Sequence, residues 1–300
     1  MIWYPAGAEI PGWRTLLYER GVRHMAMSYV GLGRRVKNTD TWSIGAKFPA
    51  DVKVLLDSGG HTINKQNVDT DLGLLPVTLE RYERFAIENL DRVSLAVELD
   101  AKALTSALRR AHRSRLHEVF QDRFLPIWDS DTGLNELQRL ADTYGRVGVS
   151  QTVLGGRDIT PVLRSLARAG TRLHGVAMTQ IEAMRTIPWD SVASTSWLSP
   201  SQYGDTIIWT SQGELKRYPR RYADQARKRY RTYLTQHGFD AAAIEAGNST
   251  ELLRLSIWSW NAYVTHLNEQ TTMVYLLHRL KRMMSLMRNY YPMMLINPLG

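Results

Sequence analysis

A carboxylate followed by paired glycines is the first feature of this sequence that could carry chemistry. Residues 54–57 read VLLD and are followed by Ser58, Gly59 and Gly60. Glycines let the backbone approach a flat ligand closely and offer unhindered N–H groups. Asp57 is therefore a candidate acid or base, with Ser58 and Gly59 in a loop that contacts the ligand. The alternative is an ordinary turn that caps the next element.

Two more carboxylates, Glu98 and Asp100, end a second apolar run at residues 94–100. Side chains two positions apart in a strand face the same side, so either acid could accept a hydrogen bond from the amino group of a heterocycle. The alternative is that these acids cap helices or pair with Arg109 or Arg110.

Further candidates for contacts with a base are Trp128, Ser150 and Gln151, which also follow apolar runs. Trp128 could stack on a base, and the Gln151 amide could hydrogen-bond to a base edge. The alternative is that Trp128 belongs to the core and that Gln151 is loop scaffolding. The chain has no Cys, and its eight His show no HExxH spacing, so we expect no metal and in particular no zinc.

These polar groups follow eight apolar runs that we predict to be strands, with helix-periodic segments between them. The pattern predicts an α/β fold of the (β/α)8 TIM-barrel type, in which chemistry lies at the carboxyl ends of the strands; the alternative is an open doubly wound sheet. We predict a barrel over residues 1–212 and a basic helical extension over 213–300. The predicted strands are 24–30, 52–57, 94–100, 124–129, 147–151, 173–178, 191–197 and 206–210, and the predicted helices are 79–90, 104–120, 134–144, 159–169, 222–236 and 250–291.

The formal net charge of +9 favours a polyanionic partner. Basic residues are dense at 216–231, where tyrosines lie between them, and a second cluster follows the first predicted strand. The alternative is a solvated basic helix. The predicted nucleic-acid contacts are Arg34, Arg35, Lys37, Lys216, Arg217, Arg220, Arg221, Arg227, Lys228 and Arg231.

No apolar run approaches the roughly 20 residues that a membrane span requires, and the first residues lack the basic region of a secretory signal. We therefore expect a cytoplasmic protein, in the host cytoplasm if a phage encodes it, without a membrane partner. The methionines at 283, 284, 287, 293 and 294 are interpreted as packing residues or as a surface for homo-oligomer formation.

Four segments together resemble the tRNA-guanine transglycosylase superfamily: VLLDSGGHT at 54–62, SQTVLGG at 150–156, LHGVA at 173–177 and SVASTSWLSPSQYG at 191–204. They look most similar to the phage and bacterial branch that inserts 7-deazaguanines into DNA, the DpdA-type proteins. The similarity runs in order over residues 48–209.

This resemblance implies exchange of guanine in DNA for a 7-deazaguanine such as preQ0, without a bound cofactor. One carboxylate would attack C1′ to form a covalent glycosyl intermediate, and a second would move protons on the departing and arriving bases. Asp57 matches the acid/base position, and Ser58 and Gly59 match the loop that contacts the base. Asp100, or alternatively Glu98, lies near the acid that recognises the heterocycle.

The chain departs from the family at the nucleophile position, where Ala193 stands in place of the expected Asp. The explanations are an engineered Asp-to-Ala change, a natural loss of catalysis, or a shifted role for Asp190 at the other end of the same strand. A second departure is the absence of the family's cysteine-rich zinc module, which makes tRNA a less suitable substrate than DNA. The further alternatives are a zinc-free tRNA-guanine exchanger and an inactive barrel that binds nucleic acid or a modified base.

Overall fold

The computed structural model describes residues 1–65, 74–155 and 158–290; for residue 74, and for 274–290 other than Met283 and Met284, it describes the backbone alone. One residue of the quoted motifs, Gly156, lies outside this range.

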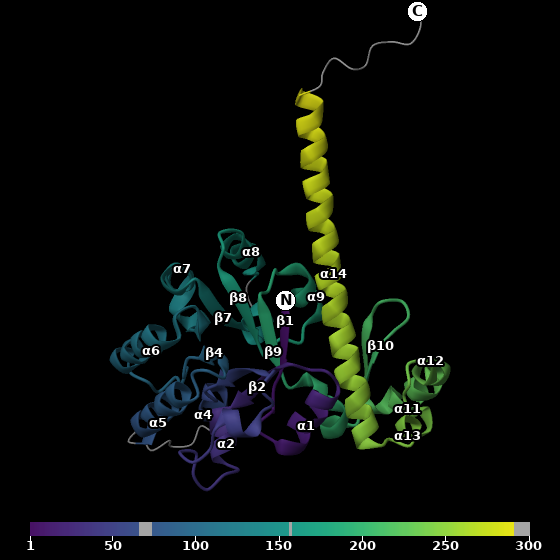
Figure 1. Ribbon diagram of the computed structural model, residues 1–300, viewed down its shortest axis with the longest axis horizontal. Helices are drawn as coiled ribbons and strands as arrows, with labels where there is room; N and C mark the ends of the chain where they lie inside the picture. The colour runs from purple at the N-terminus through teal and green to yellow at the C-terminus, as the bar shows by residue number, and fades with distance from the viewer. Residues whose placement is uncertain (66–73, 156–157, 291–300) are drawn as a thin grey trace, which may run out of the picture.

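Two parallel sheets form the centre of the molecule (Figure 1). The first contains, in spatial order, β1 (Ile2–Pro5), β9 (Ser191–Ser194), β8 (Arg172–Val176), β7 (Arg146–Ser150) and β6 (Ile127–Trp128). The second contains β2 (His24–Ser28), β3 (Lys53–Asp57), β4 (Val93–Val97) and β5 (Phe124–Leu125). All pairings within both sheets are parallel, so the chain has an α/β fold.

The two sheets approach each other at both ends. Pro126, the residue between β5 and β6, has no N–H to donate to a strand ladder, which accounts for the interruption there. At the other end, Ala6 forms an isolated parallel bridge with Ala26 in β2. Side chains from both sheets also form one apolar cluster, which includes Tyr4 and Ala193 from the first and Ala26 and Leu55 from the second.

Helices connect the strands and cover their outer faces (Figure 1). Their apolar positions recur at helical spacing; Leu137, Leu140 and Ala141, for example, form the buried side of α7. The helices are α1 (Pro11–Glu19), α2 (Tyr29–Gly33), α3 (Ile44–Lys47), α4 (Gly60–Lys65), α5 (Leu74–Glu88), α6 (Ser106–Phe120), α7 (Gly133–Tyr144), α8 (Thr160–Arg168), α9 (Ile181–Thr186) and α10 (Ser199–Tyr203), with short 3₁₀ turns at Gln121–Arg123, Ser130–Thr132, Gln151–Gly155 and Ser196–Leu198.

The predicted strand at 206–210 does not join the parallel sheets, and the strand at 2–5 was not predicted. The run at 206–210 forms β10 (Thr206–Trp209), which pairs antiparallel with β11 (Leu215–Tyr218) outside the two parallel sheets. The strand that lies beside β9 is instead β1, at Ile2–Pro5. The predicted boundary between residues 212 and 213 falls in the turn between β10 and β11.

The rest of the described chain is helical, as predicted from its periodicity. After β11 come α11 (Arg220–Arg229), α12 (Arg231–Gln236), α13 (Ala241–Glu245) and α14 (Ser249–Tyr290). The first half of α14 packs on the sheets: Trp260 stacks on Trp3 with ring centroids 6.1 Å apart, and the Ser259 hydroxyl accepts a hydrogen bond from the Trp209 N–H at 3.0 Å. Its second half extends away from the body of the molecule (Figure 1). Within the described part of the chain, no helix is both long and apolar enough to cross a bilayer.

Candidate active site

Asp57 is the last residue of β3 and is partly buried. Leu55, two positions earlier, belongs to the apolar cluster shared by the two sheets, so strand alternation directs Asp57 to the same side. The Gly59 N–H donates to Asp57 Oδ1 at 2.9 Å. Burial raises the pKa of Asp57, while this hydrogen bond and the nearby His61 act in the opposite direction.

Asp100 lies beside Asp57, just beyond the end of β4. Burial is the main cause that raises the pKa of Asp100 to about 7, and the charges of Asp57 and Glu98 raise it further. Two carboxylates in one poorly solvated place do not readily both ionise, so the second proton of the pair is lost only around neutral pH. A pair of this kind is suited to proton transfer.

Gly59 and Gly60 allow a close approach of the backbone, but the atoms approached belong to the protein and not to a ligand. A Cβ added to Gly60 would lie 1.9 Å from Asp100 Oδ1, and one added to Gly59 would lie 2.5 Å from the Val30 Cβ. Gly59 also has a φ of +90°, which side chains rarely adopt. The glycines therefore let the β3 loop pack directly against the Asp100 carboxylate. Ser58 is buried and donates to the Glu98 carbonyl oxygen at 2.8 Å.

A third carboxylate, Glu9, joins this group and was not found from the sequence. It follows β1, and its Oε2 accepts the Ser28 N–H at 3.2 Å. Burial raises the pKa of Glu9, and Asp57 adds to the rise while Arg35 opposes it. Because β1 was not predicted, nothing marked Glu9 as a residue after a strand; the signal that was available is the run IWYP at 2–5.

Glu98 and Trp128 are held by protein partners. The Glu98 carboxylate accepts from Arg113 Nε and from the Ile127 N–H, both at 2.9 Å, and is fully buried. The Glu98 carboxylate therefore faces Arg113 of α6. We expected Glu98 and Asp100 to share one face of a strand, but β4 ends at Val97, so the two residues do not lie in one regular strand. The Trp128 indole is buried and donates to the Gly133 carbonyl oxygen at 3.0 Å.

Ser150 and Gln151 lie after β7, where Gln151 ties two loops together. Its Oε1 accepts from the Thr179 N–H at 2.5 Å, the Thr179 hydroxyl at 2.8 Å and the Gln180 N–H at 2.9 Å. The loop it holds contains Ala177, which has an unusual φ of 53°. Ser150 hydrogen-bonds to the Thr152 hydroxyl at 2.9 Å. Gln151 thus fixes the loop after β8 at the same edge as Asp57.

Ala193 is the third residue of β9 and lies in the apolar cluster that Leu55 also joins. Its carbonyl oxygen accepts the Met178 N–H at 3.0 Å. Asp190 precedes β9, at the opposite end of the strands from Asp57, and pairs with Arg146 at 2.7 Å. Asp57 and Ala193 therefore lie on the sides of their sheets that carry the shared apolar cluster, and Asp190 does not belong to this group.

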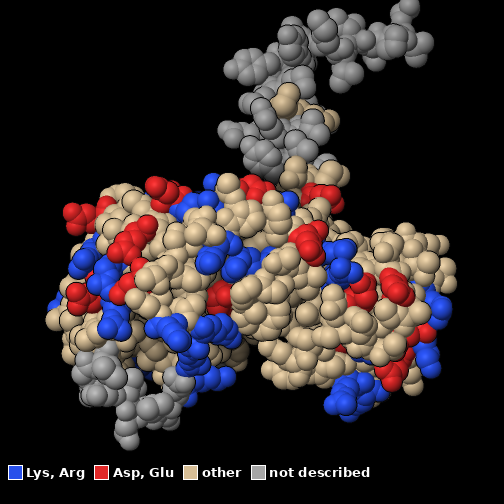
Figure 2. Space-filling model, turned by 60° about the horizontal axis from the view of Figure 1, so that its bottom comes forward, with Lys and Arg blue, Asp and Glu red and all other residues tan. Residues whose placement is uncertain are grey.

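The predicted basic residues fall into two groups. Arg34, Arg35 and Lys37 are exposed just after α2, at the edge where Glu9 and Asp57 lie. Figure 2, which turns the lower side of Figure 1 forward, shows Lys and Arg side chains gathered on that side. In the second group, all but Arg227 are exposed: Lys216, Arg217, Arg220, Arg221, Lys228 and Arg231.

Several residues of the second group are held by protein partners. Arg217 pairs with Asp205, Lys216 with Glu214 at 2.7 Å and Arg231 with Glu245 at 2.8 Å. Arg227 is buried and donates to Thr206 Oγ1 at 2.9 Å. Arg220, Arg227 and Arg231 therefore do not project together from one helix, because α11 ends at Arg229 and Arg227 is buried.

No group of three or more His, Asp or Glu among the described residues is arranged to hold a metal ion. One cavity lies beside α8 and α14 and another beside α11; neither is lined by Asp57, Asp100 or Ala193. The polar cluster is therefore defined by three carboxylates, Glu9, Asp57 and Asp100, and by the effect of the Asp57 charge on the pKa of the other two.

Comparison with known proteins adds little to this geometry. No protein-family model matches the sequence, and no curated protein matches it. One solved structure with some similarity is that of a hydrolase TatD family protein from Entamoeba histolytica, with a TM-score of 0.38 and 9% sequence identity over 87% of this chain and 97% of that chain. A likeness at this level supports no inference about activity.

Proposed function

We propose that the two parallel sheets form one closed (β/α)8 barrel and that the polar cluster at its carboxyl end belongs to a guanine-exchange site for DNA. Barrel closure is supported by the Ala6 to Ala26 bridge, by the single residue between β5 and β6, and by the apolar cluster common to both sheets. In such a barrel the carboxyl ends of the strands carry the chemistry.

The observation that carries the proposal is the coupled pair Asp57 and Asp100. A carboxyl group that is protonated near neutral pH can give its proton to guanine as the base leaves, and the resulting carboxylate can take a proton from the arriving base. The second acid is suited to recognise the heterocycle, because a carboxylate accepts the two N–H donors on the guanine edge. The sequence resemblance gives the acid/base task to Asp57 and the contact with the base to Asp100; because each carboxyl group affects the ionisation of the other, we treat the proton that leaves near pH 7 as belonging to the pair rather than to Asp100 alone.

The exchange requires a nucleophile as well. A carboxylate at position 193 would form a bond to C1′ while the bond from C1′ to N9 of guanine breaks and Asp57 supplies a proton to the base. The arriving 7-deazaguanine would then give its N9 proton to Asp57, bond to C1′ and release the carboxylate. Ala193 cannot perform the first step, so the chain as it stands binds the substrates without exchanging them.

DNA is the proposed substrate because Arg35 lies near Glu9 of the carboxylate cluster, and Arg34 and Lys37 are exposed next to it in the sequence. The target base must leave its stack to reach a site inside a barrel end, which costs a few kcal/mol in a duplex and less in a single strand. A barrel that only binds a base or nucleic acid is the second candidate, and the absence of a nucleophilic group at Ala193 favours it.

Release of radiolabelled guanine from single-stranded DNA tests the proposal. We expect release with Ala193→Asp and none with the parent chain or Ala193→Asn, which has nearly the same shape without a nucleophilic oxygen pair. Adding Asp57→Asn to Ala193→Asp should abolish the release. A folded Ala193→Asp variant that binds DNA but releases no guanine would support the binding module, and release from tRNA alone would support a tRNA exchanger.

A further inference from the structure

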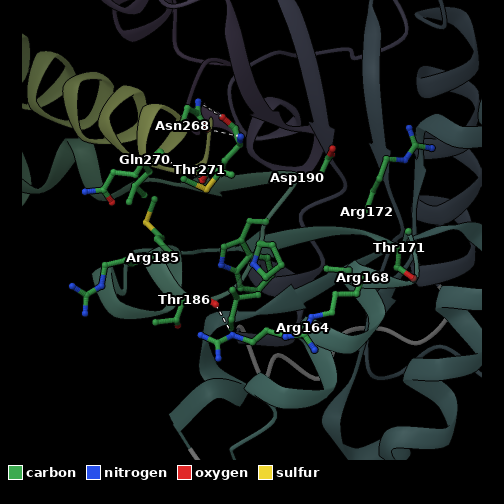
Figure 3. Close-up of a pocket in the computed structure, with 18 residues that line it drawn as sticks. Arg164, Arg168, Thr171, Arg172, Arg185, Thr186, Asp190, Asn268, Gln270 and Thr271 are labelled. Atoms are coloured by element: carbon green, nitrogen blue, oxygen red, sulfur yellow. Dashed lines mark hydrogen bonds between the residues drawn. The ribbon is translucent and has the colours of Figure 1, made fainter. Parts of the chain in front are cut away.

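A cavity of about 750 Å³ lies at the end of the sheets opposite Asp57. Its lining comes from α8, from α9 and the segment before β9, from the start of β8, and from α14 (Figure 3). Arg172 begins β8 and Asp190 precedes β9, so the cavity lies at the amino ends of these strands. Its volume is in the range of sites for small organic ligands.

The cavity is lined by four arginines and one carboxylate. Three of these charges already have partners: Arg172 pairs with Asp122 at 3.1 Å, Arg185 with Glu182 at 2.6 Å, and Asp190 with Arg146 at 2.7 Å. Two arginines remain, Arg164 and Arg168, and neither has an acidic partner within the described part of the chain.

Arg164 and Arg168 are one helical turn apart on α8 and therefore share a face. Figure 3 shows both side chains on the same side of the cavity. Arg164 is oriented by a hydrogen bond from its Nε to the Thr186 carbonyl oxygen at 2.7 Å, which leaves its two terminal nitrogens available. Two guanidinium groups on one side of a cavity match the oxygens of a phosphate monoester.

The rest of the lining is mixed, with apolar residues beside Thr171, Thr186, Gln270 and Thr271. Met184, Ile187 and Leu267 are buried apolar residues of the wall, and Pro188 is exposed beside them. The polar side chain of Asn268 is occupied: its Oδ1 accepts from the Met1 nitrogen at 2.7 Å and its Nδ2 donates to the Met1 carbonyl oxygen at 3.0 Å. A ligand with a phosphate at one end and a ring system at the other uses both parts of the cavity.

We propose that this cavity binds a nucleoside monophosphate, with the phosphate held by Arg164 and Arg168 and the base against Ile187 and Pro188. The site is separate from the carboxylate cluster and does not depend on the exchange reaction.

Isothermal titration of the full chain with adenosine monophosphate tests the proposal. We expect saturable one-to-one binding, at least tenfold weaker binding of adenosine, and about a tenfold loss of affinity in both Arg164→Gln and Arg168→Gln, because each removes a charge-assisted contact to phosphate. Arg110→Gln is the matched control: Arg110 is exposed on α6, away from the cavity, and its loss should leave the affinity unchanged.

Two further measurements keep the result clear. Thermal unfolding should show that Arg168→Gln is folded, since Arg168 is exposed. Asp57→Asn should bind adenosine monophosphate as the parent does; loss of binding there with retention in Arg168→Gln would place the ligand at the other site and overturn the proposal. The proposal is also wrong if the parent shows no saturable binding at millimolar ligand, or if the two arginine variants lose affinity for a single-stranded oligonucleotide instead.

Discussion

Asp100 combines burial with a neighbouring carboxylate, and the consequence is a dependence of stability on pH. Its pKa rises from 3.8 to about 7 on folding, mainly through burial and further through Asp57 and Glu98. The folded state therefore binds this proton more tightly than the unfolded chain does, and the contribution of Asp100 to the free energy of unfolding falls as pH rises through that interval. Three pH units correspond to an upper limit of about 4 kcal/mol.

Asp100→Asn should therefore be more stable than the parent at pH 8, with the difference shrinking toward pH 4, where both side chains are neutral. Urea unfolding at both pH values measures this. Asp91→Asn, at an exposed position without such neighbours, is the control and should change little. A stability difference between Asp100→Asn and the parent that is the same at pH 8 and pH 4 would contradict this account of Asp100.

Gly60→Ala should destabilise the chain by more than about 2 kcal/mol, because its Cβ would lie 1.9 Å from Asp100 Oδ1. Removing the clashing group in Gly60→Ala/Asp100→Ala should recover part of that loss. Gly12→Ala is the matched control on α1, where nothing lies within 4 Å, and it should be neutral or stabilising. Thermal unfolding of the parent and the three variants measures these stabilities. Equal losses of stability in Gly60→Ala and Gly12→Ala would contradict a direct clash.

The sequence marked Asp57 and Asp100 because an acid after an apolar run is visible without a structure. It did not mark Glu9, because the short run before it contains Pro5 and was not recognised as a strand. The direction of the Glu98 side chain toward α6 also escaped prediction, since its partner Arg113 is 15 residues away in the sequence and arrives through the packing of α6.

At the scale of elements, Gln151 joins the loops after β7 and β8 through one side-chain oxygen that accepts three hydrogen bonds. Gln151→Ala should leave those donors without their partner, increase amide hydrogen exchange at Thr179 and Gln180, and lower stability by about 1 to 3 kcal/mol. Gln151→Glu keeps an acceptor oxygen and should protect the same amides. Unchanged exchange in Gln151→Ala would show that the loop is held by other contacts.

Seven predicted strands lie in the parallel sheets, one of them divided into β5 and β6, and most of their residues are buried. The eighth, TIIW at 206–209, is also mostly buried, so periodicity alone could not show that its partner is antiparallel. The partner, LKRY at 215–218, is mostly exposed and was assigned to the basic extension.

At the scale of the whole molecule, charge near the carboxylates matters more than total charge. Arg34, Arg35 and Lys37 are exposed there, whereas Arg217 and Arg231 are neutralised by acids. Replacing the first three by Gln should weaken binding of single-stranded DNA and reduce the slope of log affinity against log salt by about 2, if each contacts one phosphate. Fluorescence anisotropy over a salt series measures this slope.

Replacing Lys216, Arg217 and Arg231 by Gln is the comparison with equal charge loss. It should change the slope less, because these three cations are already paired with Glu214, Asp205 and Glu245. The sequence shows the charges but not these ion pairs. Equal effects of the two triple variants would mean that binding follows net charge rather than the face that carries Asp57.

The most direct measurement of the central claim is covalent capture of DNA at position 193. Ala193→Asp, once shown to be folded, is incubated with a guanine-containing single strand and denatured. The account predicts a protein–DNA adduct that survives denaturation, is absent from the parent and from Ala193→Asn, and disappears when a 7-deazaguanine base is added. A folded Ala193→Asp chain that binds the strand and yields no adduct would contradict it.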